Sequence, residues 1–288
     1  MNTKAIFVSD LHGHWDRFEK LLQYIRQEQP EGVFIGGDIL PIAYARMKPP
    51  YSGACDFLSN KLFPALARLK EELKENYPAI FLIPGNDDPR VFERFLMEGE
   101  ANGIWKYVAL RWQDWQGFRI FGYPFVPPTP FLLKDWERYD VSRFVDPGCV
   151  PPDEGRRTVE VSIEESRYQT IAKDLEEMAS GRDFHRSIFL FHSPPYQTLL
   201  DRAALDGKMV DHVLLDVNIG SIAIKRFLEN KQPYLTLHGH VHESARLTGA
   251  WQQKIGRTVS YNAAHDGEEL SIILFDAKNP ENARRLLL

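Results

Sequence analysis

The sequence lacks the features that mark secreted disulfide-rich proteins and membrane-spanning proteins. Its only cysteines among 288 residues are Cys55 and Cys149, too few for a disulfide framework and without the spacing of a cysteine metal site. No apolar run is long enough to span a bilayer, and the apolar stretch at residues 5–8 is far shorter than the core of a signal peptide. These absences predict a soluble, cytoplasmic protein with no membrane partner.

The sequence also has no excess of positive charge. It carries 35 Lys and Arg residues against 40 Asp and Glu, a formal net charge of -5. Proteins that hold nucleic acid over a broad surface normally present many more cations, so neither nucleic acid nor a nuclease-type groove is expected. A small phosphorylated substrate remains compatible with this charge, because a local metal centre attracts phosphate whatever the overall balance.

The first half of the chain alternates short apolar runs with segments of helical periodicity. The runs at residues 5–8, 33–35 and 80–83 are rich in branched and aromatic side chains, which predicts buried strands. Helices are predicted after the first run and over residues 56–76. The first of these helices is indicated by the spacing of Trp15, Phe18, Leu21, Leu22 and Ile25. Alternating strands and helices are typical of parallel βαβ units.

The second half is richer in predicted strands. Strands are expected at residues 118–125, 187–191, 234–237, 258–261 and 270–275. Helical periodicity returns at residues 163–179 and 219–228. No internal repeat is visible, so we expect one α/β domain over residues 1–288.

Residues from about 126 to 160 form an insertion without sustained periodicity. A connection this long is either a lid over a functional site or a surface insertion. Five of its side chains could stack on a base or contact phosphate, or could instead pack the insertion onto the body of the protein, which is somewhat favoured. They are Trp136, Arg138, Tyr139, Arg143 and Phe144. Deleting residues 127–155 separates these alternatives: a higher KM with metal content intact indicates a lid, and loss of folding indicates packing.

Side chains that can bind metal follow five of the predicted strands. They are Asp10 and His12, Asp38, Asn86, His192, and the pair His240 and His242. Sites in open α/β sheets form beyond the carboxyl ends of strands, so these clusters could converge on one cleft. Side chains two residues apart on extended backbone point the same way, which lets each Asp-x-His or His-x-His pair reach one centre. A mixed set of Asp, His and Asn suits Mn²⁺, Fe or Zn²⁺.

Each cluster alone is weak evidence for a metal site. An Asp at a strand end is more often a turn former or a helix cap. A lone histidine such as His192 is more often packed or hydrogen bonded than a metal ligand. The ordered joint pattern, with every member at the end of an apolar run, argues against chance.

This ordered set resembles the calcineurin-like metallophosphoesterase superfamily. The motifs that carry the resemblance are Asp10-Leu11-His12, Gly37-Asp38, Gly85-Asn86, His192 and Gly239-His240-Val241-His242. They span residues 10–242, nearly the whole chain. The resemblance implies an α/β fold in which two mixed β-sheets pack as a sandwich flanked by helices (α/β/β/α).

The resemblance also implies a dinuclear metal centre and a reaction. One divalent ion would be held by Asp10, His12, Asp38 and His242, and Asp38 would bridge to a second ion completed by Asn86, His192 and His240. The ions could be Mn, Fe, Zn or Ni. The implied reaction is hydrolysis of a phosphodiester or phosphomonoester by a metal-held hydroxide. Nucleotides are among the candidate substrates, and the sequence predicts no oligomeric state.

One position departs from the family pattern. Most members have a histidine after Gly-Asn that contacts phosphate and assists the leaving group, whereas this chain has Asp87. An ionised carboxylate there would repel phosphate. We hypothesise that Asp87 weakens acid assistance and favours substrates with good leaving groups.

Two other histidines could supply the missing acid. His14 and His238 each lie two residues from a proposed ligand. The alternative for His14 is a residue at the start of the following helix, and the alternative for His238 is a hydrogen-bonded histidine inside a strand.

The main competing function is a non-catalytic scaffold on the same fold. Loss of catalysis usually accompanies missing ligands, and here every ligand that the resemblance implies is present. Only the presence of Asp87 in place of the usual histidine favours the scaffold. Metal stoichiometry discriminates between the two, because a scaffold need not retain two ions.

Overall fold

The computed structural model describes residues 3–48 and 57–288. The three apolar runs of the first half form parallel strands, as predicted: β1 (Lys4–Val8), β2 (Gly32–Ile35) and β3 (Ala79–Leu82). A fourth parallel strand that was not predicted, β4 (Lys106–Tyr107), pairs with β3. The late strands β13 (Ser271–Asp276) and β14 (Asn279–Leu287) extend this sheet antiparallel from β1. The order of the first sheet is β14-β13-β1-β2-β3-β4.

The second sheet comes from the later half of the chain. Its order is β11-β12-β10-β7-β6-β5. The four inner strands are parallel: β6 (Phe118–Tyr123), β7 (Ser187–Phe191), β10 (Leu235–His238) and β12 (Thr258–Asn262). The edge strands β5 (Trp112–Trp115) and β11 (Gln252–Ile255) pair antiparallel with their neighbours. A separate hairpin joins β8 (Met209–Val210) to β9 (Val213–Leu214).

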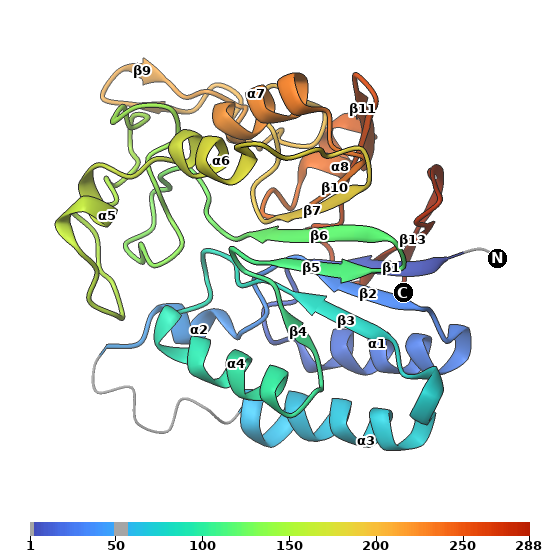
Figure 1. The fold of residues 1–288 in the computed structure, drawn as a ribbon. Helices are drawn as coiled ribbons and strands as arrows, with labels where there is room; N and C mark the ends of the chain where they lie inside the picture. Colours follow the sequence, from blue (N-terminus) through green and yellow to red (C-terminus); the bar gives the residue numbers. More distant parts are fainter. Residues whose placement is uncertain (1–2, 49–56) are drawn as a thin grey trace.

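Helices cover the outer faces of both sheets, which gives the expected α/β/β/α layers (Figure 1). On the first sheet lie α1 (Trp15–Glu28), α3 (Phe63–Leu73) and α4 (Glu93–Ala101); on the second lie α6 (Ile171–Ala179) and α7 (Ile222–Lys231). The shorter helices are α2 (Ile42–Ala45), α5 (Ile163–Arg167) and α8 (Ser244–Thr248). In the part of the chain described, none of the helices combines the length and apolar character needed to traverse a lipid bilayer.

Aromatic side chains join the inner faces of the two sheets. Phe34 of β2 meets Trp115 of β5 with ring centroids 5.4 Å apart, and Tyr261 of β12 meets Phe275 of β13 at 5.6 Å. Edge-to-face contacts of this kind add to the stabilisation from burial. A Cβ at Gly32 would lie 2.4 Å from the Trp115 ring, so only glycine admits this close approach of the sheets.

The structure divides two of the predicted helices. The segment 163–179 breaks into α5 and α6, because Thr170 is extended and its side chain caps α6 by accepting a hydrogen bond from the backbone N–H of Lys173. The segment predicted over residues 56–76 consists of a π-helical turn (Leu58–Leu62), α3 and a 3₁₀ turn (Lys74–Asn76). Its predicted start at Asp56 lies outside the described residues, as does Cys55.

Candidate metal centre

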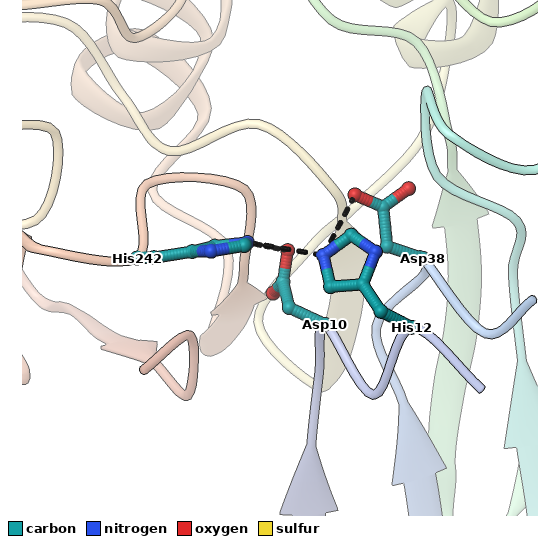
Figure 2. A group of neighbouring side chains, drawn as sticks. All are labelled: Asp10, His12, Asp38 and His242. Carbon is teal, nitrogen blue, oxygen red and sulfur yellow. Dashed lines mark hydrogen bonds and ion pairs between the residues drawn. The ribbon is translucent and has the colours of Figure 1, made fainter. Parts of the chain in front are cut away.

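Four of the predicted ligands converge beyond the carboxyl ends of β1, β2 and β10 (Figure 2). Asp10, His12, Asp38 and His242 each offer one ligand atom, and these atoms all lie within 4.8 Å of one another. His242 Nε2 lies 3.1 Å from Asp10 Oδ1 and 3.2 Å from His12 Nε2. His12 Nε2 lies 3.7 Å from Asp38 Oδ2. This group could hold one metal ion.

The remaining three predicted ligands lie on the other side of Asp38. His192, directly after β7, places its Nε2 3.4 Å from Asp38 Oδ2 and 3.1 Å from Asn86 Oδ1. The ring of His240 lies against that of His192, with centroids 5.3 Å apart. The structure therefore brings all seven predicted ligands into one continuous cluster, with Asp38 next to both halves.

Four residues of the cluster have a left-handed backbone conformation. Asp10, His12, Asp38 and His240 have φ values of 58°, 46°, 50° and 71°, in the left-handed region that costs a non-glycine residue about 1–2 kcal/mol. The first three are held there by main-chain contacts, among them the His12 N–H donating to the Asp38 carbonyl at 2.7 Å. Strained residues persist where surrounding contacts hold them, and they are common at functional sites. Eight other non-glycine residues among those described also have positive φ, so the strain agrees with a functional site here but does not by itself identify one.

Glycine in the third motif is required by close packing. A Cβ at Gly85 would lie 2.3 Å from Asp38 Oδ1 and 2.6 Å from His192 Nε2. Any larger residue would displace one of two proposed ligands. The glycine therefore does more than allow a turn, because it lets the loop after β3, which carries Asn86, approach Asp38.

The two central carboxylates are ionised although they are buried. Burial opposes ionisation of Asp10, but its hydrogen bond to His242 and the charges of the surrounding histidines hold its pKa below the usual value. Burial likewise opposes ionisation of Asp38, and the neighbouring His192 outweighs it and lowers the pKa of Asp38. In return, despite burial, the Asp38 carboxylate raises the pKa of His192 to about 10. The pKa is raised in this way only for His192 and His242 among the histidines of the cluster, whereas burial lowers the pKa of His12 and of His240.

The donor set fits divalent metal ions. His12 Nδ1 is buried without a hydrogen-bond partner among the described residues, and the Nε2 atoms of His12 and His242 face each other. Only one proton can lie between two imidazole nitrogens, whereas a metal ion can accept a lone pair from each of them. Metal binding displaces protons from its ligands, so divalent ions could supply the positive charge that the buried carboxylates attract. Carboxylate and imidazole together suit borderline ions such as Mn²⁺ or Zn²⁺.

Asp87 lies at the edge of the cluster. Its backbone N–H donates to Asp38 Oδ1 at 2.8 Å, and its carboxylate lies 3.8 Å from His12 Nδ1. Burial and the charges of Asp38 and Asp88 raise the pKa of Asp87 to about 8. The position that departs from the family pattern thus lies beside the proposed ligands.

Asp88 is a supporting residue to which the sequence analysis gave no role. Its buried carboxylate accepts the backbone N–H groups of Ile39 at 3.0 Å, Leu40 at 2.7 Å and Gly85 at 2.8 Å. It thereby ties the loop after β2 to the loop after β3, the two loops that carry Asp38 and Asn86. The sequence shows an aspartate directly after Gly85-Asn86-Asp87, but it does not show the partners of this side chain. Ile39 and Leu40 lie 49 and 48 residues away, and only the fold brings them to Asp88.

The two histidines considered as substitute acids lie outside the cluster. His14 is exposed and precedes α1, and its side chain makes no capping hydrogen bond. His238 is fully buried, with Nδ1 2.9 Å from the Ser193 carbonyl oxygen and Nε2 2.8 Å from Thr236 Oγ1. Burial lowers the pKa of His238 to about 4. This geometry favours the alternative of a hydrogen-bonded strand histidine.

The insertion packs mainly onto the body of the protein. Trp136, Tyr139 and Arg138 are buried, and Arg138 forms ion pairs with Asp174 of α6 and Glu165 of α5. Phe144, by contrast, is 70% exposed. In Figure 1 the segment after β6 lies on the side to which the arrows of β2, β3 and β6 point, the side that carries the cluster.

A sequence profile of the calcineurin-like phosphoesterase family matches residues 3–244, most of the chain. The chain belongs to that family. The match includes all seven predicted ligands and confirms the resemblance seen in the motifs. The members of the family are phosphoesterases, and the cluster at Asp10, His12, Asp38 and His242 gives this one a candidate metal site.

Solved structures support the same fold. One chain that is 18% identical aligns with a TM-score of 0.61 over 100% of this chain and 99% of its own. The protein TT1561 of Thermus thermophilus is 15% identical with a TM-score of 0.57, and a dimetal phosphatase from Danio rerio is 12% identical with a TM-score of 0.51. Both alignments cover 100% of this chain and 99% of the other. No curated protein matches the sequence.

Proposed function

We propose that this chain is a dinuclear metal-dependent phosphoesterase that hydrolyses a small phosphorylated substrate, a diester or a monoester. The observation that carries the proposal is the shared position of Asp38, between a group of four ligands and a group completed by Asn86, His192 and His240. On this proposal the described residues form one calcineurin-like domain, and the insertion supports its site.

The chain's own residues would hold two divalent ions in place. Asp10, His12 and His242 would bind one, Asn86, His192 and His240 the other, and Asp38 both. Bound there, such a pair of ions activates water and neutralises negative charge on a phosphoryl group. The hydrogen bonds from the Asp87 N–H to Asp38 and from the His240 N–H to Asp10 at 3.0 Å would orient these carboxylates.

Hydrolysis that depends on added metal is the first expected result. After chelation, the protein should lose turnover of bis-p-nitrophenyl phosphate and p-nitrophenyl phosphate, and Mn²⁺, Ni²⁺, Zn²⁺ or Mg²⁺ added singly should restore it. The ratio of diester to monoester rates then narrows the substrate class. A folded protein that hydrolyses neither ester with any metal would favour the scaffold or an enzyme that needs its own substrate.

Asp87 should set the preference for leaving groups. Asp87→His introduces a proton donor beside the cluster, and general acid catalysis contributes about 10²–10⁴-fold where the leaving group is poor. We expect the variant to gain at least about tenfold on an unactivated diester, such as a cyclic nucleotide, relative to bis-p-nitrophenyl phosphate.

Asp87→Asn is the matched control, because its amide carries neither the carboxylate charge nor a titratable proton. If both variants leave the ratio between the two substrates as in the wild type, Asp87 has no part in leaving-group preference. An equal gain in both variants would assign the effect to charge repulsion instead.

A further inference from the structure

The insertion is hydrogen bonded directly to the loop that carries Asn86. The indole Nε1–H of Trp136 donates to the Asp88 carbonyl oxygen at 2.8 Å. Asp135 accepts the backbone N–H of Arg90 at 2.8 Å, and Thr158 Oγ1 accepts that of Val91 at 3.0 Å. Three side chains of the insertion thus bind successive parts of the main chain just after Asn86.

The indole of Trp136 is itself held rigidly. It is 2% exposed, packs against Phe125 with ring centroids 5.5 Å apart, and lies beneath the Arg90 guanidinium at 5.2 Å. The main chain around it is also paired, because the Trp136 carbonyl accepts the Val126 N–H at 3.0 Å. A donor fixed on several sides can hold its acceptor in one place.

The acceptor of this bond is two residues from a proposed ligand. The side chain of Asp88 already anchors one end of the loop through Gly85, and Trp136 fixes its main-chain carbonyl. Asn86, between these anchors, presents its Oδ1 to His192 at 3.1 Å. Groups that orient metal ligands typically change metal affinity about 10–100-fold when removed.

We infer that Trp136 is a positioning residue for the second metal ion, acting through the Asp88 carbonyl to hold Asn86 against His192. This rests on the proposed dinuclear centre. It gives the insertion a role in the site that is distinct from contact with substrate.

Trp136→Phe tests the inference, because it keeps an aromatic ring and removes the N–H donor. Equilibrium dialysis of the full-length protein against graded Mn²⁺, with manganese counted per chain, should show two ions in the wild type. In the variant, one ion should need at least about tenfold more free Mn²⁺ while the other is bound as before.

Trp105→Phe is the matched control. Trp105 is also buried, at 3% exposure, and its Nε1–H donates to the Leu96 carbonyl at 2.7 Å, in the region of α4 and β4. The control should bind both ions with wild-type affinity. Thr158→Val removes the hydroxyl that accepts the Val91 N–H, so it should weaken binding of the same ion. This variant replaces Trp136→Phe as the test if Trp136→Phe does not fold.

The outcomes separate this inference from the proposed function. Two ions bound with unchanged affinity in Trp136→Phe or, if that variant does not fold, in Thr158→Val would overturn the inference and leave the dinuclear centre intact. Equal weakening in Trp105→Phe would also overturn it, since loss of buried volume would then explain the effect. A wild-type protein that binds fewer than two ions would refute the dinuclear centre, and the inference with it.

Discussion

Asp38→Asn is expected to lower metal-dependent hydrolysis by about a thousand-fold, equivalent to about 4 kcal/mol of transition-state stabilisation. The substitution removes the carboxylate that lies 3.7 Å from His12 Nε2 and 3.4 Å from His192 Nε2, between the two halves of the cluster. An amide carries no negative charge and cannot bridge two cations as a carboxylate does. The measurement is kcat/KM for bis-p-nitrophenyl phosphate with saturating Mn²⁺, together with manganese counted per chain.

Asp114→Asn provides the control for this loss. Asp114 is an exposed residue of β5, so the same change of carboxylate to amide should leave both turnover and metal content as in the wild type. Circular dichroism should show that both variants are folded. Full activity in Asp38→Asn would contradict the assignment of Asp38 as the shared ligand.

Lys134→Met is expected to lower the free energy of unfolding by about 3–5 kcal/mol. Lys134 and Glu137 form an ion pair at 2.5 Å inside the insertion, and both side chains are fully buried. Glu137 also accepts hydrogen bonds from the N–H and hydroxyl of Thr129. Removing the lysine leaves a buried carboxylate without its cation, a large cost in a medium of low polarity. Urea unfolding followed by circular dichroism measures the change.

Two further variants show whether the unpaired charge is the cause. Lys134→Met combined with Glu137→Leu should recover much of the lost stability, because the double variant buries no charge. Lys254→Met breaks an ion pair of the same 2.5 Å length whose side chains are 54% and 58% exposed, and should cost less than about 1 kcal/mol. Equal losses in Lys134→Met and Lys254→Met would show that burial of the pair is unimportant.

Deletion of residues 127–155 could either raise the KM with metal content intact or prevent folding, and the contacts of the insertion favour the second result. Trp136 and Arg138 are buried, and Asp140 accepts hydrogen bonds from the N–H groups of Ile222 at 2.6 Å and Ala223 at 3.2 Å, at the start of α7. Deletion would remove these buried side chains and leave the first N–H groups of α7 without the Asp140 carboxylate that accepts their hydrogen bonds. We therefore expect the deletion variant not to fold, which is the result that indicates packing of the insertion onto the body of the protein.

The sequence by itself determined the inner strands of both sheets and the candidate ligands. Each inner strand was a short apolar run, because burial on both faces produces such a run. The edge strands β4, β5, β11 and β14 contain polar side chains and were not predicted. The ligands were predictable because each follows a parallel strand, and parallel strands end at one edge of a sheet. The order of Asp10, Asp38, Asn86, His192 and His240 along the chain then sufficed to indicate the family, which its profile confirms.

Only the tertiary structure decided the roles that depend on distant partners. His238 and His240 differ by two positions, yet one ring is hydrogen bonded to Ser193 and Thr236 and the other lies against His192. Asp88 and Trp136 support the Asn86 loop through contacts that span 48 or 49 residues. Local pattern carries no information about such contacts, because they arise when loops from different strands meet. The chemistry of the site was therefore visible in the sequence, and its support became visible only in the fold.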